Sequence, residues 1–257
     1  MFDGVALVTG AGSGLGQLMS WRLAAAGVTV AAVDVSEEGL ARTARRAPQV
    51  RPHVVDVTDE AAVRELVAGV EADLGPIGRL VNAAAIAPTR PLLDQPMDEI
   101  RRLVEINYLG LASVTKTVVP AMVERRRGQV VQFASLAGWL PTPHFGAYSA
   151  SKFAVVAFSE TLAHELEGSG VHLVCVCPPI VDTPLLEQIA SRPPGFETMP
   201  PIRPEVVIDA IEQSLDRREL WCFPGRGTST LWRLRRLAPD VLWRRLDALG
   251  TTASAHA

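Results

Sequence analysis

Short apolar runs rich in β-branched residues alternate along the chain with longer segments in which apolar residues recur at helical spacing. The runs are VALVTG, VTVAAVD, HVVDV, RLVNA, QVVQFAS, VHLVCVC and LWCF, and the helical segments include one from about Met97 to Glu124 and one from about Gly146 to Glu167. Strands that alternate with helices are joined by right-handed crossovers. The pattern therefore predicts an α/β fold with a doubly wound, parallel, seven-stranded sheet and helices on both faces.

No linker-like segment divides this alternation, so residues 1–225 are predicted to form a single domain. Within it, the proline-rich stretch 184–204 lies outside the alternation and has the apolar residues expected of a lid over a substrate cleft. A surface loop with scattered apolar residues is the alternative. The apolar residues of the stretch are Leu185, Leu186, Ile189, Phe196, Met199 and Ile202.

The composition narrows the class of protein. A hydrophobic fraction of 48% is ample for a buried core, and 25 basic against 28 acidic residues are too evenly balanced to favour nucleic-acid binding. Cys175, Cys177 and Cys222 lack the spacing of a zinc site, which predicts buried thiols and no bound metal. No signal peptide or membrane-spanning segment is recognisable, so we expect a cytoplasmic protein.

The first apolar run leads directly into a glycine-rich turn, Thr9 to Gly16, and a helix follows. Glycines let the backbone of such a turn approach a pyrophosphate, and the free N–H groups of the helix N-terminus face the anion. Glycines alone would indicate only a tight connection, but the strand–turn–helix order favours a Rossmann-type dinucleotide site. The residues expected to contact the cofactor are Gly10, Ser13, Gly14, Leu15 and Gly16.

Asp34 ends the second predicted strand, where a carboxylate can bind the hydroxyls of a cofactor ribose. A 2′-phosphate about 5 Å away would be repelled by roughly 3 kcal/mol per unit charge at an effective dielectric constant of about 20. No arginine or lysine occurs at residues 7–17 or 34–39 to offset this repulsion. The sequence therefore predicts NAD rather than NADP. Capping of the next helix is the alternative role for Asp34.

Tyr148 and Lys152 are four residues apart in a predicted helix, so their side chains share one face. The chain has only one other tyrosine and one other lysine. An ammonium about 4 Å from the phenol would lower the pKa of the tyrosine by about 3 units, toward neutral pH. The spacing therefore predicts a tyrosine that transfers protons.

Two further polar residues complete a candidate catalytic set. Ser135 ends a predicted strand, at the edge of the sheet where ligands bind, and its hydroxyl could hold a substrate oxygen. Asn107 lies in an apolar helical segment, where an amide needs a partner. Taken singly, Ser135 is better explained as a turn cap and Asn107 as a core hydrogen-bonding group. Together with Tyr148 and Lys152 they favour catalysis.

The chain resembles the short-chain dehydrogenase/reductase family over about residues 2–224. The resemblance rests on T-G-x-x-x-G-x-G at Thr9–Gly16, the pair Asp56-Val57, Asn82, Asn107, Ser135, and Y-x-x-x-K at Tyr148–Lys152. It implies that Tyr148 is the general acid/base and that Lys152 lowers the tyrosine pKa and binds the nicotinamide ribose. It also implies that Ser135 orients the substrate oxygen and that Asn107 holds a water in a proton relay.

Further cofactor contacts and an oligomer are implied by the same resemblance. Asp56 and Val57 would flank the adenine, and Asn82 would lie near the adenosine ribose. The helices that carry Asn107 and Tyr148 form the usual subunit interface of the family, which implies a homodimer or homotetramer. The remaining cofactor-binding residues implied are Ala84, Pro178, Val181 and Thr183.

The sequence thus predicts an NAD-dependent oxidoreductase that transfers hydride to or from a small-molecule secondary alcohol or ketone. The apolar residues of the predicted lid indicate that this substrate is lipophilic. Two alternatives stay open. A reductase of 3-ketoacyl chains could use Arg125, Arg126 and Arg127 to dock an acidic carrier protein, although cations at a helix C-terminus are the simpler explanation of these residues. A nucleotide-sensing or membrane-associated protein of the same fold would not need the complete catalytic set.

Residues 226–257 are predicted to form a basic amphipathic tail. Leucines recur in it at near-helical spacing together with Trp232 and Trp243. Positions 217–247 contain eight arginines but only three acidic residues. Pro239 would divide the segment into two short helices, each of which needs a surface to lie on. An anionic membrane is one such surface. The protein's own lid or a partner subunit is the other, slightly favoured because tryptophan and leucine also bury well in cores.

Overall fold

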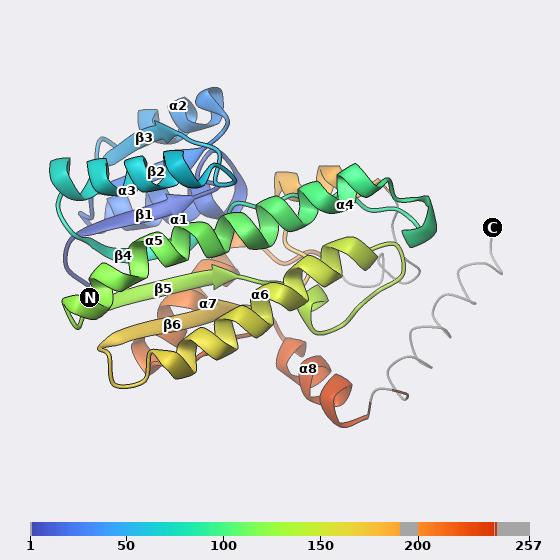
Figure 1. Ribbon diagram of the computed structural model, residues 1–257. Coiled ribbons are helices and arrows are strands. Elements are labelled where there is room, and N and C mark those ends of the chain that lie inside the picture. The colour runs from blue at the N-terminus through green and yellow to red at the C-terminus, as the bar shows by residue number, and fades with distance from the viewer. Residues whose placement is uncertain (1, 191–199, 239, 241–257) are drawn as a thin grey trace.

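The computed structural model describes residues 2–190, 200–238 and 240 (Figure 1). Its seven strands form one sheet in the order β3-β2-β1-β4-β5-β6-β7, and every neighbouring pair is parallel. The order reverses between β1 and β4, as in doubly wound folds, so the predicted fold class is confirmed. The strands are β1 (Val5–Thr9), β2 (Val30–Asp34), β3 (Val50–Val54), β4 (Ile77–Asn82), β5 (Gly128–Phe133), β6 (Val171–Val176) and β7 (Trp221–Cys222).

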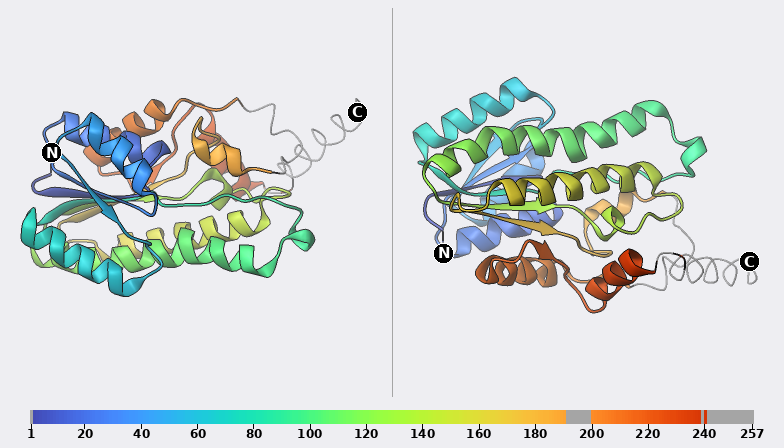
Figure 2. Two further views of the ribbon diagram at one scale, coloured as in Figure 1. Left: turned by 90° about the horizontal axis from the view of Figure 1, so that it is seen from above. Right: turned by 60° about the horizontal axis from the view of Figure 1, so that its bottom comes forward.

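Helices cover both faces of the sheet (Figure 2). Because side chains alternate along a strand, Val5 and Leu7 of β1 pack under one layer of helices, while Ala6 and Val8 pack under the other. The first layer contains α3 (Glu60–Asp73), α5 (Leu111–Glu124) and α6 (Gly146–Glu165), and the second contains α1 (Gly14–Ala25), α2 (Glu37–Arg46) and α7 (Pro204–Arg217).

The predicted helix from Met97 to Glu124 is present, but its hydrogen bonding changes midway. It consists of α4 (Met97–Val104), a π-helical turn (Glu105–Gly110) and then α5. A π-helical turn widens the helix by one residue and is frequent at functional sites. Here it contains Asn107, one of the candidate catalytic residues.

Strand β3 lies earlier in the chain than the apolar run HVVDV predicts. It spans Val50–Val54, paired with β2 from Val30 to Asp34. Pro52 obscures the start of this strand in the sequence, yet it is tolerated because β3 is an edge strand. Asp56 and Val57 consequently lie beyond the strand, in the loop at its carboxyl end.

The lid and tail regions are described only in part. A short 3₁₀ helix, η4 (Pro184–Gln188), begins the predicted lid, and Ile202 near its other end pairs with Val181 in an isolated parallel bridge. Helix α8 (Thr228–Leu237) forms the start of the tail. The predicted lid residues Phe196 and Met199, and the tail from residue 241 onward, lie outside the described residues. In the part of the chain that is described, no helix is both long enough and apolar enough to cross a membrane.

A polar network is buried where β4 and β5 meet α5. The side-chain nitrogen of Asn82 donates to Thr115 Oγ1 at 2.9 Å and to Gln132 Oε1 at 3.1 Å. Gln132 Nε2 also donates to Thr115 Oγ1, at 3.0 Å, and the Thr115 hydroxyl donates to the carbonyl oxygen of Leu111 at 2.7 Å. Asn82, Thr115 and Gln132 are all buried, so this single hydroxyl accepts hydrogen bonds from two amides in the core.

We expect Thr115→Val to destabilise the protein by about 2 to 4 kcal/mol, because it removes, at nearly constant volume, an acceptor that two buried amide groups share. Urea unfolding followed by circular dichroism measures the change. The matched control is Thr117→Val, which removes only a half-buried hydroxyl bonded to Ser113 within the same helix. Equal effects of the two substitutions would contradict the structural role of the network.

Candidate active site

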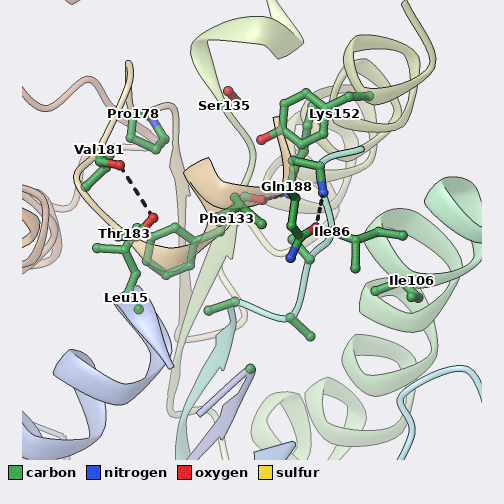
Figure 3. A pocket seen from close by; sticks show the side chains of 18 of the residues that line it. Leu15, Ile86, Ile106, Phe133, Ser135, Lys152, Pro178, Val181, Thr183 and Gln188 are labelled. Atoms are coloured by element: carbon green, nitrogen blue, oxygen red, sulfur yellow. Dashed lines mark hydrogen bonds between the residues drawn. The ribbon is translucent and has the colours of Figure 1, made fainter. Parts of the chain in front are cut away.

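A cavity of about 610 Å³ opens at the carboxyl ends of the strands, where the order of the sheet reverses. Open α/β sheets bind their ligands at this position. Figure 3 shows part of its lining from close by. The residues predicted from sequence that line it are Gly10, Ser13, Gly14, Leu15, Gly16, Asp34, Asp56, Val57, Ala84, Ser135, Tyr148, Lys152, Pro178, Val181 and Thr183.

Two positions of the first turn must be glycine, because backbone atoms approach them too closely for a side chain. Gly10 has a φ of +67°, and a Cβ at this position would lie 2.7 Å from the backbone nitrogen of Ala84. A Cβ at Gly16 would overlap the carbonyl oxygen of Gly10. Helix α1 begins at Gly14, which is itself in the cavity wall, so the positive end of the helix dipole lies at the cavity. This turn has the shape and polarity to hold a pyrophosphate.

Asp34 joins the end of β2 to this turn. Its carboxylate accepts hydrogen bonds from the backbone nitrogens of Gly12 and Ser36, each at 2.9 Å. The helix cap proper is the side chain of Ser36, which accepts from Gly39 N at 3.1 Å. Since each carboxylate oxygen has further lone pairs, Asp34 can still accept hydrogen bonds from ribose hydroxyls in the cavity.

A buried brace behind the turn was not recognised from sequence. Thr43 Oγ1 donates to the carbonyl oxygen of Ala11 at 2.8 Å, and Gln17 Nε2 donates to Gly12 O at 3.2 Å and to Thr43 Oγ1 at 2.8 Å. Both side chains come from helices that flank the turn. The only available signal was a buried threonine on the apolar face of α2.

Asp56, Val57 and Arg102 form the wall of the cavity beyond Asp34. Burial alone would raise the pKa of the Asp56 carboxyl, but hydrogen bonds from Thr58 and from Arg102 outweigh burial and hold that pKa below its ordinary value. The Arg102 guanidinium lies 3.2 Å from the Asp56 carboxylate. Arg102 comes from α4, far away in the chain, and nothing in the local sequence marks it as a cavity residue.

Ser135, Tyr148 and Lys152 lie together at the other end of the cavity. Ser135 Oγ accepts a hydrogen bond from Ala137 N at 3.1 Å, so it caps the 3₁₀ turn η3 (Leu136–Gly138), and its hydroxyl lies near the Tyr148 phenol. Lys152 Nζ donates to the carbonyl oxygen of Phe133 at 2.8 Å and lies 5.9 Å from the centre of the Tyr148 ring.

Burial shifts both ionisable groups toward their neutral forms. It raises the pKa of the Tyr148 phenol, a shift that the nearby Ser135 hydroxyl opposes, and it lowers the pKa of the Lys152 ammonium to about 8. Lys152 Nζ lies 5.9 Å from the centre of the Tyr148 ring and donates its hydrogen bond to Phe133. The predicted lowering of the Tyr148 pKa by Lys152 stays a prediction.

The two asparagines are not among the cavity-lining residues. Asn82 lies in the buried network at the end of β4. Asn107 accepts from Ile86 N at 2.9 Å and donates to Ile86 O at 3.0 Å and to Ser151 Oγ at 3.1 Å. Its side chain therefore fixes the loop after β4, whose residues do line the cavity. Its predicted hold on a relay water stays a prediction.

The loop after β6 closes a third side of the cavity with Pro178, Val181 and Thr183 (Figure 3). It leads into η4, where Gln188 Oε1 accepts a hydrogen bond from Ala87 N at 2.9 Å. Since Ala87 belongs to the loop after β4, this bond joins the two loops. Leu185 and Ile189 of this segment pack with Phe145 and Tyr148. The first part of the predicted lid thus lies against the candidate catalytic residues.

These walls fit an extended dinucleotide. A glycine turn that leaves no room for side chains lies beside a strand-end carboxylate, and the cavity continues to Tyr148 and Lys152. For metals, none of the described residues form a group of three or more histidines, cysteines, aspartates or glutamates able to hold an ion.

Comparison with known proteins agrees with this geometry. Residues 4–194 match the family model described as short chain dehydrogenase. The chain is 30% identical over 254 residues to estradiol 17-beta-dehydrogenase 11 of Rattus norvegicus, an alignment that covers 95% of this chain and 84% of the relative.

Two solved structures are similar throughout. A short chain dehydrogenase/reductase from Burkholderia phymatum in complex with NAD gives a TM-score of 0.85 at 26% identity, over 94% of this chain and 96% of that one. A short-chain dehydrogenase from Sphingobium yanoikuyae in complex with NADPH gives 0.80 at 26% identity, with the same coverage of 94% and 96%. The fold, the motifs and these matches place the chain in the short-chain dehydrogenase/reductase family of oxidoreductases.

Proposed function

We propose that the protein is an NAD(H)-dependent dehydrogenase that interconverts lipophilic secondary alcohols and ketones, with Tyr148 as the proton-transfer residue. The observation that carries the proposal is that Ser135, Tyr148 and Lys152 line the same cavity as the glycine turn. An oxygen held by the Ser135 hydroxyl would also be within reach of the Tyr148 phenol. When bound, the nicotinamide supplies or accepts the hydride.

Each of the three residues has a separate task in this proposal. Tyr148 donates its phenolic proton to the oxygen of a ketone during reduction and removes the hydroxyl proton of an alcohol during oxidation. Ser135 holds that oxygen by a hydrogen bond. The Lys152 ammonium, oriented by Phe133, stabilises the phenolate that forms when the proton leaves.

Asp34 supports NAD over NADP as the cofactor. Its carboxylate is fixed by Gly12 and Ser36 in the cavity wall, where it would repel a 2′-phosphate. The cation Arg102 also lines the cavity, but it is paired with Asp56 and, more loosely, with Glu105. Of the two solved relatives, one binds NAD and the other NADPH. The fixed carboxylate of this chain is thus the main support for NAD.

The lining of the substrate end supports an apolar substrate. Around Ser135 and Tyr148 it consists mainly of hydrophobic side chains, among them Ile86, Leu136, Leu140, Phe145 and Leu185. A cavity of this kind favours ligands with a large apolar surface. The name of the rat relative refers to estradiol, a molecule of this type.

The geometry argues against docking of an acyl carrier through the three arginines. Residues 125–127 precede β5, at the edge of the sheet opposite the cavity. Arg125 pairs with Glu71, Arg126 donates to the carbonyl oxygen of Gly168, and Arg127 pairs with Asp3. These arginines hold the ends of neighbouring elements together, a structural role that accounts for them without a carrier protein.

We further propose a homodimer or homotetramer in which the helices of the π-turn and of Tyr148 form the interface. Leu109, Val123 and Phe153 are exposed on these helices. Such side chains favour contact with a second copy of the chain.

The described cysteines are free and buried, in keeping with a reducing, cytoplasmic compartment.

Replacing Tyr148 by phenylalanine should lower kcat for secondary alcohols by at least about a hundredfold, because the proton loses its acceptor. NAD affinity, measured by calorimetry, should be retained since the glycine turn is unaffected. Tyr108→Phe, at the only other tyrosine, is the control and should keep wild-type kcat. Full turnover in the Tyr148 variant would remove this residue from the mechanism.

The ratio of kcat/KM for NAD to that for NADP should exceed one in the wild-type protein and fall by at least about tenfold in Asp34→Ala, because repulsion of the 2′-phosphate is lost. Glu37→Ala removes a nearby exposed carboxylate that does not line the cavity and should leave the ratio nearly unchanged. A wild-type preference for NADP would show that Asp34 does not select the cofactor.

Alcohol oxidation should become faster from neutral to alkaline pH, and ketone reduction slower, because oxidation needs the Tyr148 phenolate and reduction the phenol. Burial raises the pKa of Tyr148, which places the change on the alkaline side. Burial lowers the pKa of Lys152 to about 8, so its ammonium can stabilise the phenolate near neutral pH and is lost at alkaline pH. Lys152→Met should therefore slow oxidation more at neutral than at alkaline pH. Initial-rate profiles in both directions provide the test, and an equal slowing at both pH values would contradict the role of Lys152.

A further inference from the structure

Helix α8, the first part of the basic tail, packs on the body of the protein near the carboxyl ends of the strands (Figure 2). Leu231 and Leu234 are three residues apart and therefore share a face of the helix. Both pack against the buried side chains of Leu136 and Leu140. Leu136 directly follows Ser135 in the chain, so α8 reaches the neighbourhood of the residue that would hold the substrate oxygen.

Aromatic contacts hold α8 in this position. The Trp232 ring stacks on Phe223 with centroids 5.1 Å apart and meets the edge of Trp139 at 5.8 Å. Trp139 in turn packs edge-on against Trp221 of β7 at 5.0 Å. At the start of the helix, the buried Thr228 hydroxyl donates to the carbonyl oxygen of Pro224 at 2.8 Å. Helix α8 is thus anchored to β7 and to the segment after Ser135.

Only one of the two leucines reaches the cavity. Leu231 lines it together with Leu136 and Leu140, whereas Leu234 contacts the same two leucines without lining the cavity. The exposed residues of α8 include Arg233 and Arg236, which face away from this contact. The helix therefore presents an apolar side chain to the cavity and charged side chains to the outside.

We propose that Leu231 is a specificity-determining residue: with Leu136 and Leu140 it forms an apolar wall that contacts the part of the substrate extending away from the reacting carbon. The inference rests on the proposed alcohol dehydrogenase function and assigns the first segment of the tail to substrate selection. A substrate with a long or bulky apolar group would bury that group against this wall, and a short alcohol would not reach it.

The test compares Leu231→Gln with Leu234→Gln, which place the same amide three residues apart on one face of α8. For each protein, kcat/KM with NAD is measured for isopropanol and for secondary alcohols of increasing chain length. The ratio of the long-chain to the isopropanol value should fall about tenfold in Leu231→Gln, since a polar group replaces apolar contact with the chain. It should stay at the wild-type value in Leu234→Gln. Equal ratios in all three proteins, or an equal fall in both variants, would overturn the proposal.

A binding measurement separates this inference from the proposed reaction. The neutral apolar dye Nile red is titrated into the three full-length proteins in the presence of NAD. About tenfold weaker binding in Leu231→Gln alone supports the apolar wall, and equal affinities in the three proteins contradict it. If the wild-type protein oxidises none of the alcohols, the proposed function fails, and the dye affinities still decide whether Leu231 forms a binding wall.

Discussion

The crevice between the carboxyl ends of β1 and β4 determines where the functional groups of this protein lie. The crossovers that follow these two strands run to opposite faces of the sheet, so the loops diverge and leave space between them. At the floor of this space the two loops touch: Thr9 Oγ1 accepts hydrogen bonds from Ala83 N at 3.1 Å and from Ala84 N at 3.2 Å. The absence of a side chain at Gly10 permits this contact, and the cofactor-binding wall is built above it.

Burial is the second constraint, and it acts on the chemistry directly. Tyr148 and Lys152 are 8% and 2% exposed, and burial favours the neutral form of each. In the proposed reaction, a protonated phenol beside Ser135 is well suited to give its proton to a ketone. The reverse reaction requires a buried phenolate, whose formation depends on the nearby ammonium and on the orientation that Phe133 gives it. Under this proposal the same site works in both directions, with pH setting the balance.

Local patterns in the sequence predicted most of the fold and much of the candidate site. The alternation of strands and helices is local, and so are the glycine turn, Asp34 at a strand end and the spacing of Tyr148 and Lys152. Long-range packing was not predictable in the same way: Arg102, Thr43 and Leu231 reach the cavity or its supports from distant helices. The start of β3 was misplaced because its position depends on pairing with β2, while Pro52 conceals the strand locally. The deep burial of Tyr148 was also missed, since spacing gives proximity to a cation but not depth of burial.

The central claim is that hydride passes between an alcohol carbon and NAD in this cavity. Its most direct test uses secondary alcohols deuterated at the carbinol carbon, incubated with the protein and NAD in ordinary water, with the nicotinamide product analysed by mass spectrometry. The account predicts NADH that carries one deuterium from the substrate. Absence of NADH with every alcohol, or NADH without deuterium, would contradict it.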